Sequence, residues 1–318
     1  MESLLQGRVS IVVPVYNEGE HIRSSMAYVG EICDKASIPY ELVLVDDGSS
    51  DNSWEEMQSM AKEDPRVTAV RLSRNFGKEP ALCAGLDSAS GDAVIVMDAD
   101  LQHPPEYIPE MVRLWKEGAE VVEGVKSSRG KEKKSYRLCA KLFYGAINKA
   151  TGIEFDNASD FKLLDRKVVE AMKQMPERMT FFRGMSAWVG FERRTFHFEV
   201  AERVDGGASK WSLKRLISLA VTAVTSYTSA PLHCITILGV IMFLCSIVLG
   251  IQTLYMKIAG FAQDGFTTVI LLLLFIGSMI MISLGIIGLY LMKIYHEIKG
   301  RPRYLTSRVI RHGEEEKK

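Results

Sequence analysis

The sequence predicts an α/β domain built on a mostly parallel sheet, followed by a hairpin of two membrane-spanning helices. Short β-branched runs alternate with helical periods over residues 9–126, which is typical of strands joined through helices that cover both faces of a sheet. Over residues 231–292 the only formally charged side chains are Lys257 and Asp264. A polar globular part is therefore expected to precede a membrane part.

Five strands are expected in the globular part, at residues 9–15, 41–45, 67–72, 93–97 and 121–125. Helices are expected between them, at residues 20–36, 51–63, 80–89 and 104–116. Ser50 or Asp51 can cap the second helix, and Pro104 and Pro105 suit the first turn of the fourth. Weaker patterns indicate strands at residues 161–164 and 191–200, with a helix after Asp165. Ligands of such sheets bind beyond the carboxyl ends of the strands, so the site is expected at that edge.

The apolar segments at residues 232–256 and 267–292 are long enough to cross a membrane. Each has about 25 residues and reaches roughly 37 Å as a helix, against a hydrocarbon layer of ~30 Å. The turn between them is nearly neutral, whereas both flanks are basic. The flanking cations are Lys210, Lys214, Arg215, Lys293, Lys299, Arg301 and Arg303. The positive-inside rule then predicts an integral protein of the cytoplasmic (inner) membrane with its globular part in the cytosol.

The expected domain boundaries follow from these patterns. Residues 1–210 form a cytosolic globular domain and residues 211–230 an amphipathic helix, which lies in the membrane interface or packs on the globular domain. Residues 231–292 form the two membrane helices, and residues 293–318 form a basic cytosolic tail. No secretory signal is expected in the polar residues 1–8.

Charge and cysteine usage exclude some classes of function. The formal net charge is zero, with 39 basic and 39 acidic side chains, which argues against a nucleic-acid partner bound through bulk positive charge. The five cysteines are scattered without a CxxC pair, which indicates reduced thiols in the cytosol. The basic stretch at residues 126–141 leaves two interpretations open, a solvated loop and an anion-binding loop beside the site.

The sharpest chemical signal is a pair of carboxylates, Asp98 and Asp100, where the fourth expected strand ends. In an extended chain, residues two apart project to the same face, so the two like charges repel unless a cation lies between them. A Mg²⁺ or Mn²⁺ ion that bridges to substrate phosphates would satisfy them, with Gln102 as a neutral oxygen ligand. The alternative is that both aspartates only cap the following turn.

Polar side chains also follow the first two expected strands. They are Tyr16, Asn17 and Glu18 after the first strand, whose end contains Pro14, and Asp47 and Ser49 after the second. Because the carboxyl ends of parallel strands meet at one edge, an aromatic ring and acidic groups there could hold a base and a ribose. Each motif alone is compatible with a simple turn, but their combination at the edge that carries Asp98 favours a nucleotide site.

Six short motifs and the two apolar segments together carry a family resemblance. The motifs are Val-Pro-Val-Tyr-Asn-Glu at 13–18, Asp-Asp-Gly-Ser at 46–49, Asn-Phe-Gly-Lys at 75–78, Asp-Ala-Asp-Leu-Gln-His-Pro-Pro-Glu at 98–106, Ser-Asp-Phe at 159–161 and Ser-Lys-Trp at 209–211. In combination they resemble glycosyltransferase family 2, and within it the polyprenyl-phosphate glycosyltransferases. The resemblance covers nearly the whole chain.

This resemblance implies a GT-A fold and an inverting transfer of a hexose from a nucleotide-sugar donor to a membrane polyprenyl phosphate. By the family pattern, the nucleoside is held by Pro14, Tyr16, Glu18 and Asp47, and the divalent ion by Asp98, Asp100 and Gln102. Asp160 stands at the position of the base of an inverting enzyme. Phosphates are expected to be bound by a closing loop with Arg203, Ser209 and Lys210, and the acceptor phosphate by this loop or by Arg129 and Arg137.

Two roles for Asp160 stay open. A phosphomonoester has a second pKa near ~6 and is mostly dianionic at neutral pH, so it needs little help from a base. Asp160 is then expected to orient the acceptor or the sugar more than to abstract a proton.

The donor and the class of enzyme have alternatives. UDP-glucose is the first expectation for the donor, with UDP-N-acetylglucosamine and GDP-mannose as alternatives, and the product is expected to serve envelope glycan modification. A processive polysaccharide synthase is disfavoured because the sequence has two expected spans and lacks a Gln-x-x-Arg-Trp motif. A non-catalytic nucleotide-sugar sensor is disfavoured by the carboxylates Asp98, Asp100 and Asp160. The number of copies in the assembly is left open, a homo-oligomer included.

Overall fold

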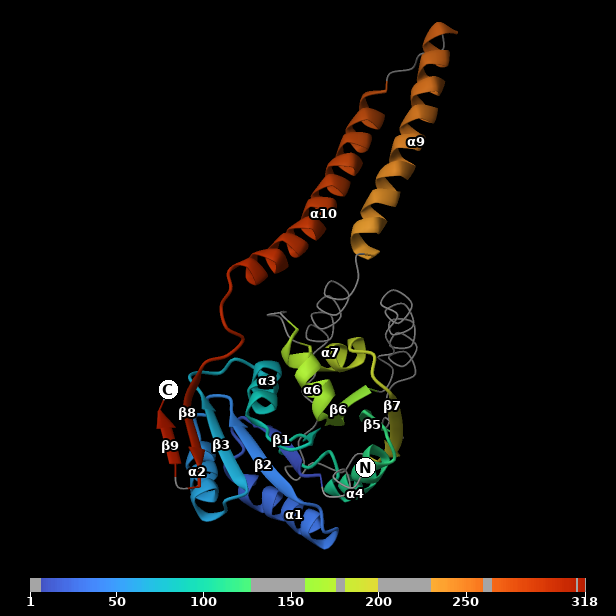
Figure 1. Ribbon diagram of the computed structural model, residues 1–318. Coiled ribbons are helices and arrows are strands. Elements are labelled where there is room, and N and C mark those ends of the chain that lie inside the picture. Colours follow the sequence, from blue (N-terminus) through green and yellow to red (C-terminus); the bar gives the residue numbers. More distant parts are fainter. Residues whose placement is uncertain are drawn as a thin grey trace. The chain divides into compact units, whose positions relative to one another are not determined.

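The structure is a computed structural model that describes residues 7–126, 158–175, 181–199, 230–259, 265–312 and 314–317. The chain divides into two compact units (Figure 1). One comprises Met1–Lys210 together with Arg301–Lys318, and the other comprises Trp211–Gly300. The expected interfacial helix at residues 211–230 lies almost entirely outside the described residues.

The first unit is a single sheet covered by helices on both faces. Its strands are β1 (Val9–Val15), β2 (Tyr40–Asp46), β3 (Val67–Leu72), β4 (Ala93–Val96), β5 (Val121–Lys126), β6 (Ala158–Asp165), β7 (Arg193–Phe198), β8 (Thr306–Arg311) and β9 (Glu314–Lys317). Its helices are α1 (Ile22–Lys35), α2 (Ser53–Glu63), α3 (Lys78–Ser88), α4 (Ile108–Lys116), α6 (Arg166–Lys173) and α7 (Phe182–Trp188), with the 3₁₀ turn η2 (Pro105–Tyr107) before α4.

The strand order is β7-β5-β6-β4-β1-β2-β3-β8-β9. The four central strands, β4, β1, β2 and β3, are all parallel to one another, as expected from helices between successive strands. On one side β6 inserts antiparallel between β4 and β5, and on the other β8 runs antiparallel to β3. The α/β fold class is confirmed, and the sheet is parallel at its centre and mixed at its flanks.

Both faces of the central strands are buried, so the sequence of each strand is a nearly continuous run of apolar residues. Ile11 and Val13 of β1 pack on the face covered by α1, α2 and α4, whereas Val12 packs on the face covered by α3, α6 and α7 (Figure 1). This alternation follows from the period of two along a strand. Each helix and strand expected over residues 9–126 is present, with small shifts at the ends.

The helix α7 has no counterpart among the sequence expectations. It is seven residues long and contains Gly184, so it offers too short and too weak a helical period to be detected. It is formed against the sheet by tertiary packing, with Phe182 and Met185 buried in the same core as Val168 of α6.

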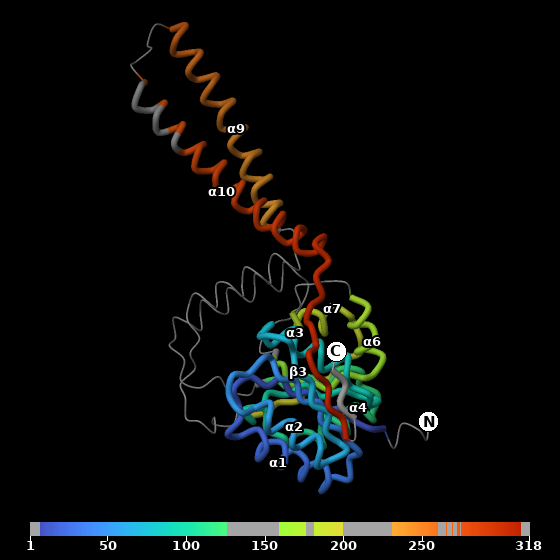
Figure 2. Tube along the Cα trace, turned by 90° about the vertical axis from the view of Figure 1, so that its left-hand side faces the viewer, coloured from blue at the N-terminus to red at the C-terminus, as the bar shows by residue number. Residues whose placement is uncertain are grey.

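The C-terminal segment returns to the first unit. Residues 293–318 were expected to form a basic tail, but within them β8 extends the sheet beside β3, and Ile310 is 2% exposed in the core (Figure 2). The hydroxyl of Tyr304 donates to Asp87 of α3 at 2.6 Å, and Arg303 donates to the carbonyl of Met175 after α6. A strand of this kind is difficult to predict from the sequence because it is basic and buries few apolar side chains.

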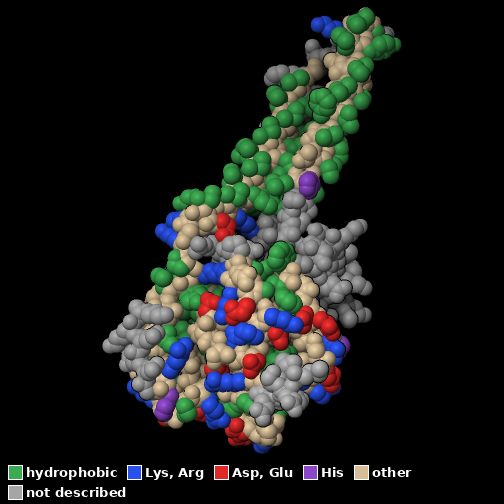
Figure 3. Space-filling view, in the orientation of Figure 1, with side chains coloured by type: hydrophobic (Ala, Val, Ile, Leu, Met, Phe, Trp, Pro, Cys, Tyr) green, Lys and Arg blue, Asp and Glu red, His purple; other side chains and the backbone are tan. Residues whose placement is uncertain are grey.

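The second unit consists of two long apolar helices, α9 (Ala230–Ile258) and α10 (Phe266–Ile298). Both are long and apolar enough to cross a membrane, with mean hydropathies of 2.8 and 2.1 over their candidate spans. Apolar side chains cover the visible surface of both helices (Figure 3). The helices flank a groove of about 290 Å³ lined by residues that include Gly239, Met242 and Ser283.

We expect Ile310→Ala to destabilise the globular unit by about 2–4 kcal/mol, because it removes buried methyl groups from the core formed when β8 joins the sheet. Arg308→Ala, on the same strand but exposed, is the matched control and should change the free energy of unfolding by less than about 0.5 kcal/mol. Chemical denaturation in detergent measures both. Equal effects of the two substitutions would contradict the placement of β8.

Candidate functional site

The loops after β1 and β2 are joined by hydrogen bonds at the carboxyl edge of the sheet. The amide of Asn17 donates to Ser49 Oγ at 3.0 Å, and Asn17 Oδ1 accepts from the amide of Ser50 at 2.9 Å. The amide of Glu18 donates to Ser53 Oγ at 2.8 Å. Asn17 has a φ of 56°, a left-handed conformation that asparagine tolerates better than most residues. These contacts hold the two loops in one fixed arrangement.

The structure thus brings the expected nucleotide residues together. The Tyr16 side chain is 49% exposed beside this pair of loops, available to a planar ligand. The side chains of Asn17 and Ser49, which were also expected to bind nucleotide, hold the two loops together.

Asp47 anchors a third loop, the one that leads from β3 into α3. Its two carboxylate oxygens accept from the amides of Phe76 and Gly77 at 2.7 and 2.8 Å. Burial raises the pKa of Asp47 above its ordinary value, although these two N–H groups act in the opposite direction. Gly77 has a φ of 100°, so the turn into α3 requires glycine. Asp47 thereby fixes where α3 begins, at Lys78.

The expected metal ligands lie just beyond β4. The strand ends at Val96 and the chain turns at Ala99 and Asp100, so the two aspartates do not share a face through a strand pleat as expected. The amide of Asp98 donates to Nδ1 of His103 at 3.2 Å, and the amide of Gln102 donates to Asp100 Oδ1 at 3.1 Å. This backbone turn holds both aspartates at the same strand end.

His103 packs in the core beside this turn. It is 4% exposed, and its ring stacks on Phe161 with ring centroids 5.1 Å apart and an interplanar angle of 5°. His103 therefore both packs in the core and accepts a hydrogen bond from the turn.

Asp98 and Asp100 fit a hard divalent cation only in part. Within the described residues no three His, Cys, Asp or Glu side chains converge as a complete metal cage. Magnesium commonly takes one or two carboxylates and completes its shell with water and substrate phosphates. The two aspartates and Gln102 therefore fit an ion that is completed by a bound diphosphate.

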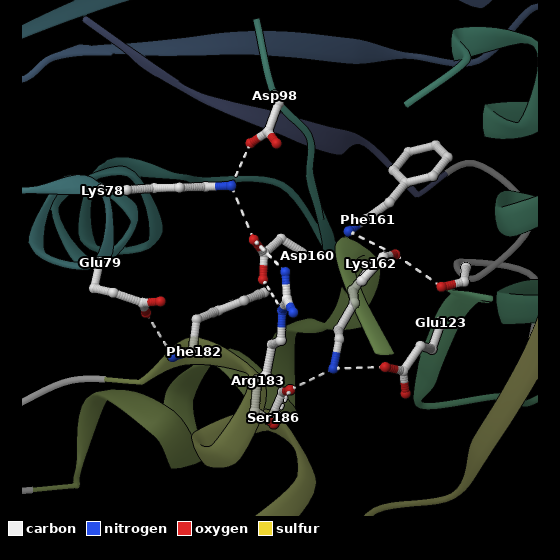
Figure 4. Close-up of polar contacts among 12 residues, drawn as sticks. Lys78, Glu79, Asp98, Glu123, Asp160, Phe161, Lys162, Phe182, Arg183 and Ser186 are labelled. Carbon is white, nitrogen blue, oxygen red and sulfur yellow. Dashed lines mark hydrogen bonds and ion pairs between the residues drawn. The ribbon is translucent and has the colours of Figure 1, made fainter. Parts of the chain in front are cut away.

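Lys78 and Arg183 converge on Asp160, the expected catalytic carboxylate (Figure 4). Lys78 Nζ lies 2.6 Å from Asp98 Oδ1 and 2.8 Å from Asp160 Oδ2, so one ammonium group joins the two acids. Arg183 donates from Nε to Asp160 Oδ1 at 2.7 Å and from Nη2 to Oδ2 at 3.2 Å. Lys78 comes from the start of α3, Asp160 from β6 and Arg183 from α7.

The two cations keep Asp160 ionised. Asp160 is 7% exposed, and burial alone would raise its pKa, but the charges of Arg183 and Lys78 outweigh burial and hold the pKa of Asp160 well below its ordinary value. Burial likewise opposes the charge of Lys78, but Asp98 and Asp160 raise its pKa above the ordinary lysine value. Asp160 and Lys78 therefore both carry their charge at neutral pH.

Glu79 is a second acid at this end of α3. Its Oε2 accepts from the amide of Phe182, the first residue of α7, at 2.6 Å. Burial, reinforced by the charge of Asp160, raises the pKa of Glu79 to about 7. Glu79 therefore joins α3 to α7 and changes its charge near neutral pH.

Sequence reasoning missed Lys78, Glu79 and Arg183. The Asn-Phe-Gly-Lys motif at 75–78 marked the place of Lys78 without a role, and Arg183 had no local signal because its partner lies 23 residues away in the chain. The expected phosphate-binding residues lie outside the described residues. They are Arg129, Arg137, Arg203, Ser209 and Lys210.

Comparison with known proteins identifies similar chains. The family model described as "Glycosyl transferase family 2" matches residues 10–172. An uncharacterized glycosyltransferase of Synechocystis sp. is 40% identical over 94% of this chain and 94% of its own length. The bactoprenol glucosyl transferase of Shigella phage SfII is 38% identical over 95% of this chain and 98% of its own. Among solved structures, glucosyl-3-phosphoglycerate synthase of Mycobacterium tuberculosis, in complex with Mn²⁺, UDP-glucose and phosphoglyceric acid, matches with a TM-score of 0.48 and 20% identity, over 70% of this chain and 79% of that one.

We expect Glu79→Gln to remove a pH dependence of stability. With a folded pKa of about 7 and an ordinary value of 4.5, the folded state binds more protons than the unfolded state between these pH values. The free energy of unfolding therefore falls as pH rises across this range, by on the order of 1 kcal/mol after allowance for partial exposure, and the variant should lose that decline.

Denaturation at pH 5 and pH 8 measures this difference. Glu31→Gln, at an exposed position of α1, is the control and should keep the decline. A decline of the same size in the Glu79→Gln variant would refute the assignment.

Proposed function

The chain belongs to glycosyl transferase family 2, and on that premise we propose that it transfers glucose, with inversion, from UDP-glucose to a membrane polyprenyl phosphate. The family membership makes it a glycosyltransferase. The finer assignment is supported by relatives named bactoprenol glucosyl transferase, whose match covers 94–95% of the chain and so includes the apolar helices.

The observation that carries the proposal is the charge cluster in which Lys78 joins Asp98 to Asp160 while Arg183 binds Asp160 from the other side. Transfer from a nucleoside diphosphate to a lipid phosphate brings together two groups of high negative charge. Fixed cations beside the transferred sugar offset that charge without reorganisation during the reaction. Lys78 and Arg183 are cations of this kind at the carboxyl edge of the sheet.

Under this proposal the residues at the strand ends bind different parts of the donor. Tyr16 and Asp47, with Pro14 and Glu18, border the nucleoside. Asp98, Asp100 and Gln102 would hold a Mg²⁺ or Mn²⁺ ion, which supplies charge stabilisation to the departing diphosphate. The loop with Arg203, Ser209 and Lys210, and the basic residues Arg129 and Arg137, remain proposed phosphate contacts.

Asp160 then orients the acceptor. An acid whose pKa lies well below the ordinary value is a weak proton acceptor, and a phosphate dianion has no proton that must be removed before it attacks. An oxygen of the acceptor phosphate attacks the anomeric carbon, and the bond to the nucleoside diphosphate breaks with its electron pair on the leaving phosphate oxygen. The Asp160 carboxylate holds Lys78 and Arg183 in place, and these two cations then lie around the attacking oxygen of the acceptor phosphate.

The proposal includes the membrane topology. Residues on both flanks of the α9–α10 segment, up to Lys210 and from Arg301, belong to the same compact unit. Two spans return the chain to the side from which it started, so both flanks can serve one globular unit. The basic flanks favour the cytosolic side of the cytoplasmic membrane.

Purified full-length protein in detergent, given undecaprenyl phosphate and one labelled donor at a time, tests the donor assignment. We expect polyprenyl-phosphate glucose from UDP-glucose, and less product by at least ~10-fold from UDP-N-acetylglucosamine or GDP-mannose, because a site built around one sugar leaves polar groups unpaired with another. Preferential turnover of either other donor would overturn glucose as the substrate. No transfer from any donor would overturn the proposed acceptor.

We expect Asp100→Asn to lower turnover by about 100-fold or more, because the neutral amide weakens the hold on a divalent ion that stabilises the leaving group. Mn²⁺ binding, measured by electron paramagnetic resonance with UDP present, should weaken in parallel. Asp34→Asn, at the exposed end of α1, is the charge-matched control and should retain both. Full wild-type activity in excess EDTA would exclude the metal role.

A further inference from the structure

A second ionic cluster lies beneath Asp160, and the proposed chemistry does not use it (Figure 4). Lys162 of β6 is 1% exposed, and its Nζ lies 3.0 Å from Glu123 Oε1 of β5. The other oxygen of Glu123 lies 3.2 Å from Nη1 of Arg193 on β7. Lys162 Nζ also donates to Oγ of Ser186 on α7 at 2.9 Å, and Ser186 is 2% exposed.

Such a cluster is a poor way to gain stability. Removing two charges from water costs free energy that their mutual attraction repays only with good geometry, and apolar residues of similar size often stabilise as much. Buried ionic groups do constrain geometry, because their partners must lie at fixed distances and directions. The position of Lys162 therefore points to orientation of its neighbours.

The contacts of Lys162 lead back to Asp160 through α7. Ser186 Oγ accepts from Lys162 and donates to the carbonyl of Arg183 at 3.1 Å, and the side chain of Arg183 binds Asp160. Asp160 and Lys162 are two residues apart on β6, so they project to the same face of the sheet. These contacts form a closed ring from Asp160 along β6 to Lys162, then Ser186, then Arg183 and back to Asp160.

The helix α7 depends on contacts of this kind for its position. A helix of seven residues is not stable alone, so tertiary contacts must hold it. Glu79 holds the amide of its first residue, Phe182, and the Lys162–Ser186 contact holds its middle. Apolar packing of Phe182 and Met185 is non-directional, whereas the two polar contacts require fixed directions and so define the rotation of the helix.

We propose that Lys162 is a positioning residue that acts through Ser186 and α7 to hold the Arg183 guanidinium on Asp160. The assignment deepens the proposed function, since it rests on Asp160 as the group that orients the acceptor. Lys162 does not touch substrate. Lys162 sets the orientation of the Arg183 guanidinium relative to the Asp160 carboxylate. This orientation determines how the charges are arranged around the acceptor phosphate.

Ser186→Ala tests the relay with a minimal change of volume. We expect kcat to fall about tenfold or more, because small displacements of positioning groups have large effects on rate, while the donor KM stays within about twofold. Hydrogen exchange should become faster at the amides of α7 and stay unchanged in α3. Ser88→Ala is the matched control, because Ser88 also donates to a carbonyl of its own helix, Ala84, at 2.8 Å. It should leave kcat unchanged.

A double substitution separates positioning from general stability. If Ser186 acts through Arg183, then adding Ser186→Ala to an Arg183→Gln protein should lower kcat no further, whereas independent effects would multiply. Full multiplication of the two effects would overturn the proposal. So would wild-type kcat and wild-type exchange of α7 in the Ser186→Ala protein.

The pair Lys162→Met with Glu123→Gln guards against a simple folding defect, because it removes both members of the fully buried ion pair together, while the Arg193 side chain is 28% exposed and keeps water and the Gln amide oxygen as partners. We expect a folded protein with the same loss of kcat and the same faster exchange in α7. Normal kcat in this folded variant would refute the role of Lys162. The exchange measurement needs no substrate, so absence of transfer from every donor would count against the proposed function while α7 exchange still decides the positioning role.

Discussion

The pairing of buried Asp160 with two cations is the constraint on which the site depends. A carboxylate that is 7% exposed must be neutralised by a proton or by fixed positive charge, and here Lys78 and Arg183 supply the charge. Lys78, Asp160 and Arg183 come from three different elements, α3, β6 and α7, so the ion pairs require these elements to meet at one point. Lys78 also reaches Asp98, and so connects Asp160 to one of the expected metal ligands.

The loop after β2, which was expected to bind the nucleotide, is connected to the same point through Asp47. Its two oxygens hold the amides of Phe76 and Gly77, and the next residue is Lys78. A change in the position of the loop after β2 would therefore move the ammonium group that joins Asp98 and Asp160. Glu79 continues this connection to α7 through the amide of Phe182. The loop after β2, the start of α3 and the charged side chains around Asp160 are thus joined by one set of polar contacts, in which Asp47 and Glu79 each accept from backbone amides.

The C-terminal return gives α3 a second support from the opposite end of the helix. Tyr304 binds Asp87 near the end of α3, and the following strand β8 completes the sheet beside β3. Burial, reinforced by the hydrogen bond to Asp87, raises the pKa of Tyr304 above its ordinary value, so the phenol stays protonated as a donor. The segment after the second apolar helix therefore contributes to the core of the globular unit, and α3 is held at Lys78 by the charge cluster and at Asp87 by this segment.

The sequence by itself determined the central parallel strands, the two apolar helices and the strand end that carries Asp98 and Asp100, because each depends on a local pattern of period, turn residues or length. Only the tertiary structure decided which charges meet. Lys78 lies 82 residues from Asp160 and Arg183 lies 23 residues from it, and no local period encodes such contacts. The helix α7 was not predicted because seven residues give too weak a helical period, and the strand β8 because it is basic and buries few apolar side chains; both form only against the rest of the sheet. Chemistry at strand ends can thus be read from a sequence, whereas the ion pairs that set the charge of a buried carboxylate depend on how distant segments pack.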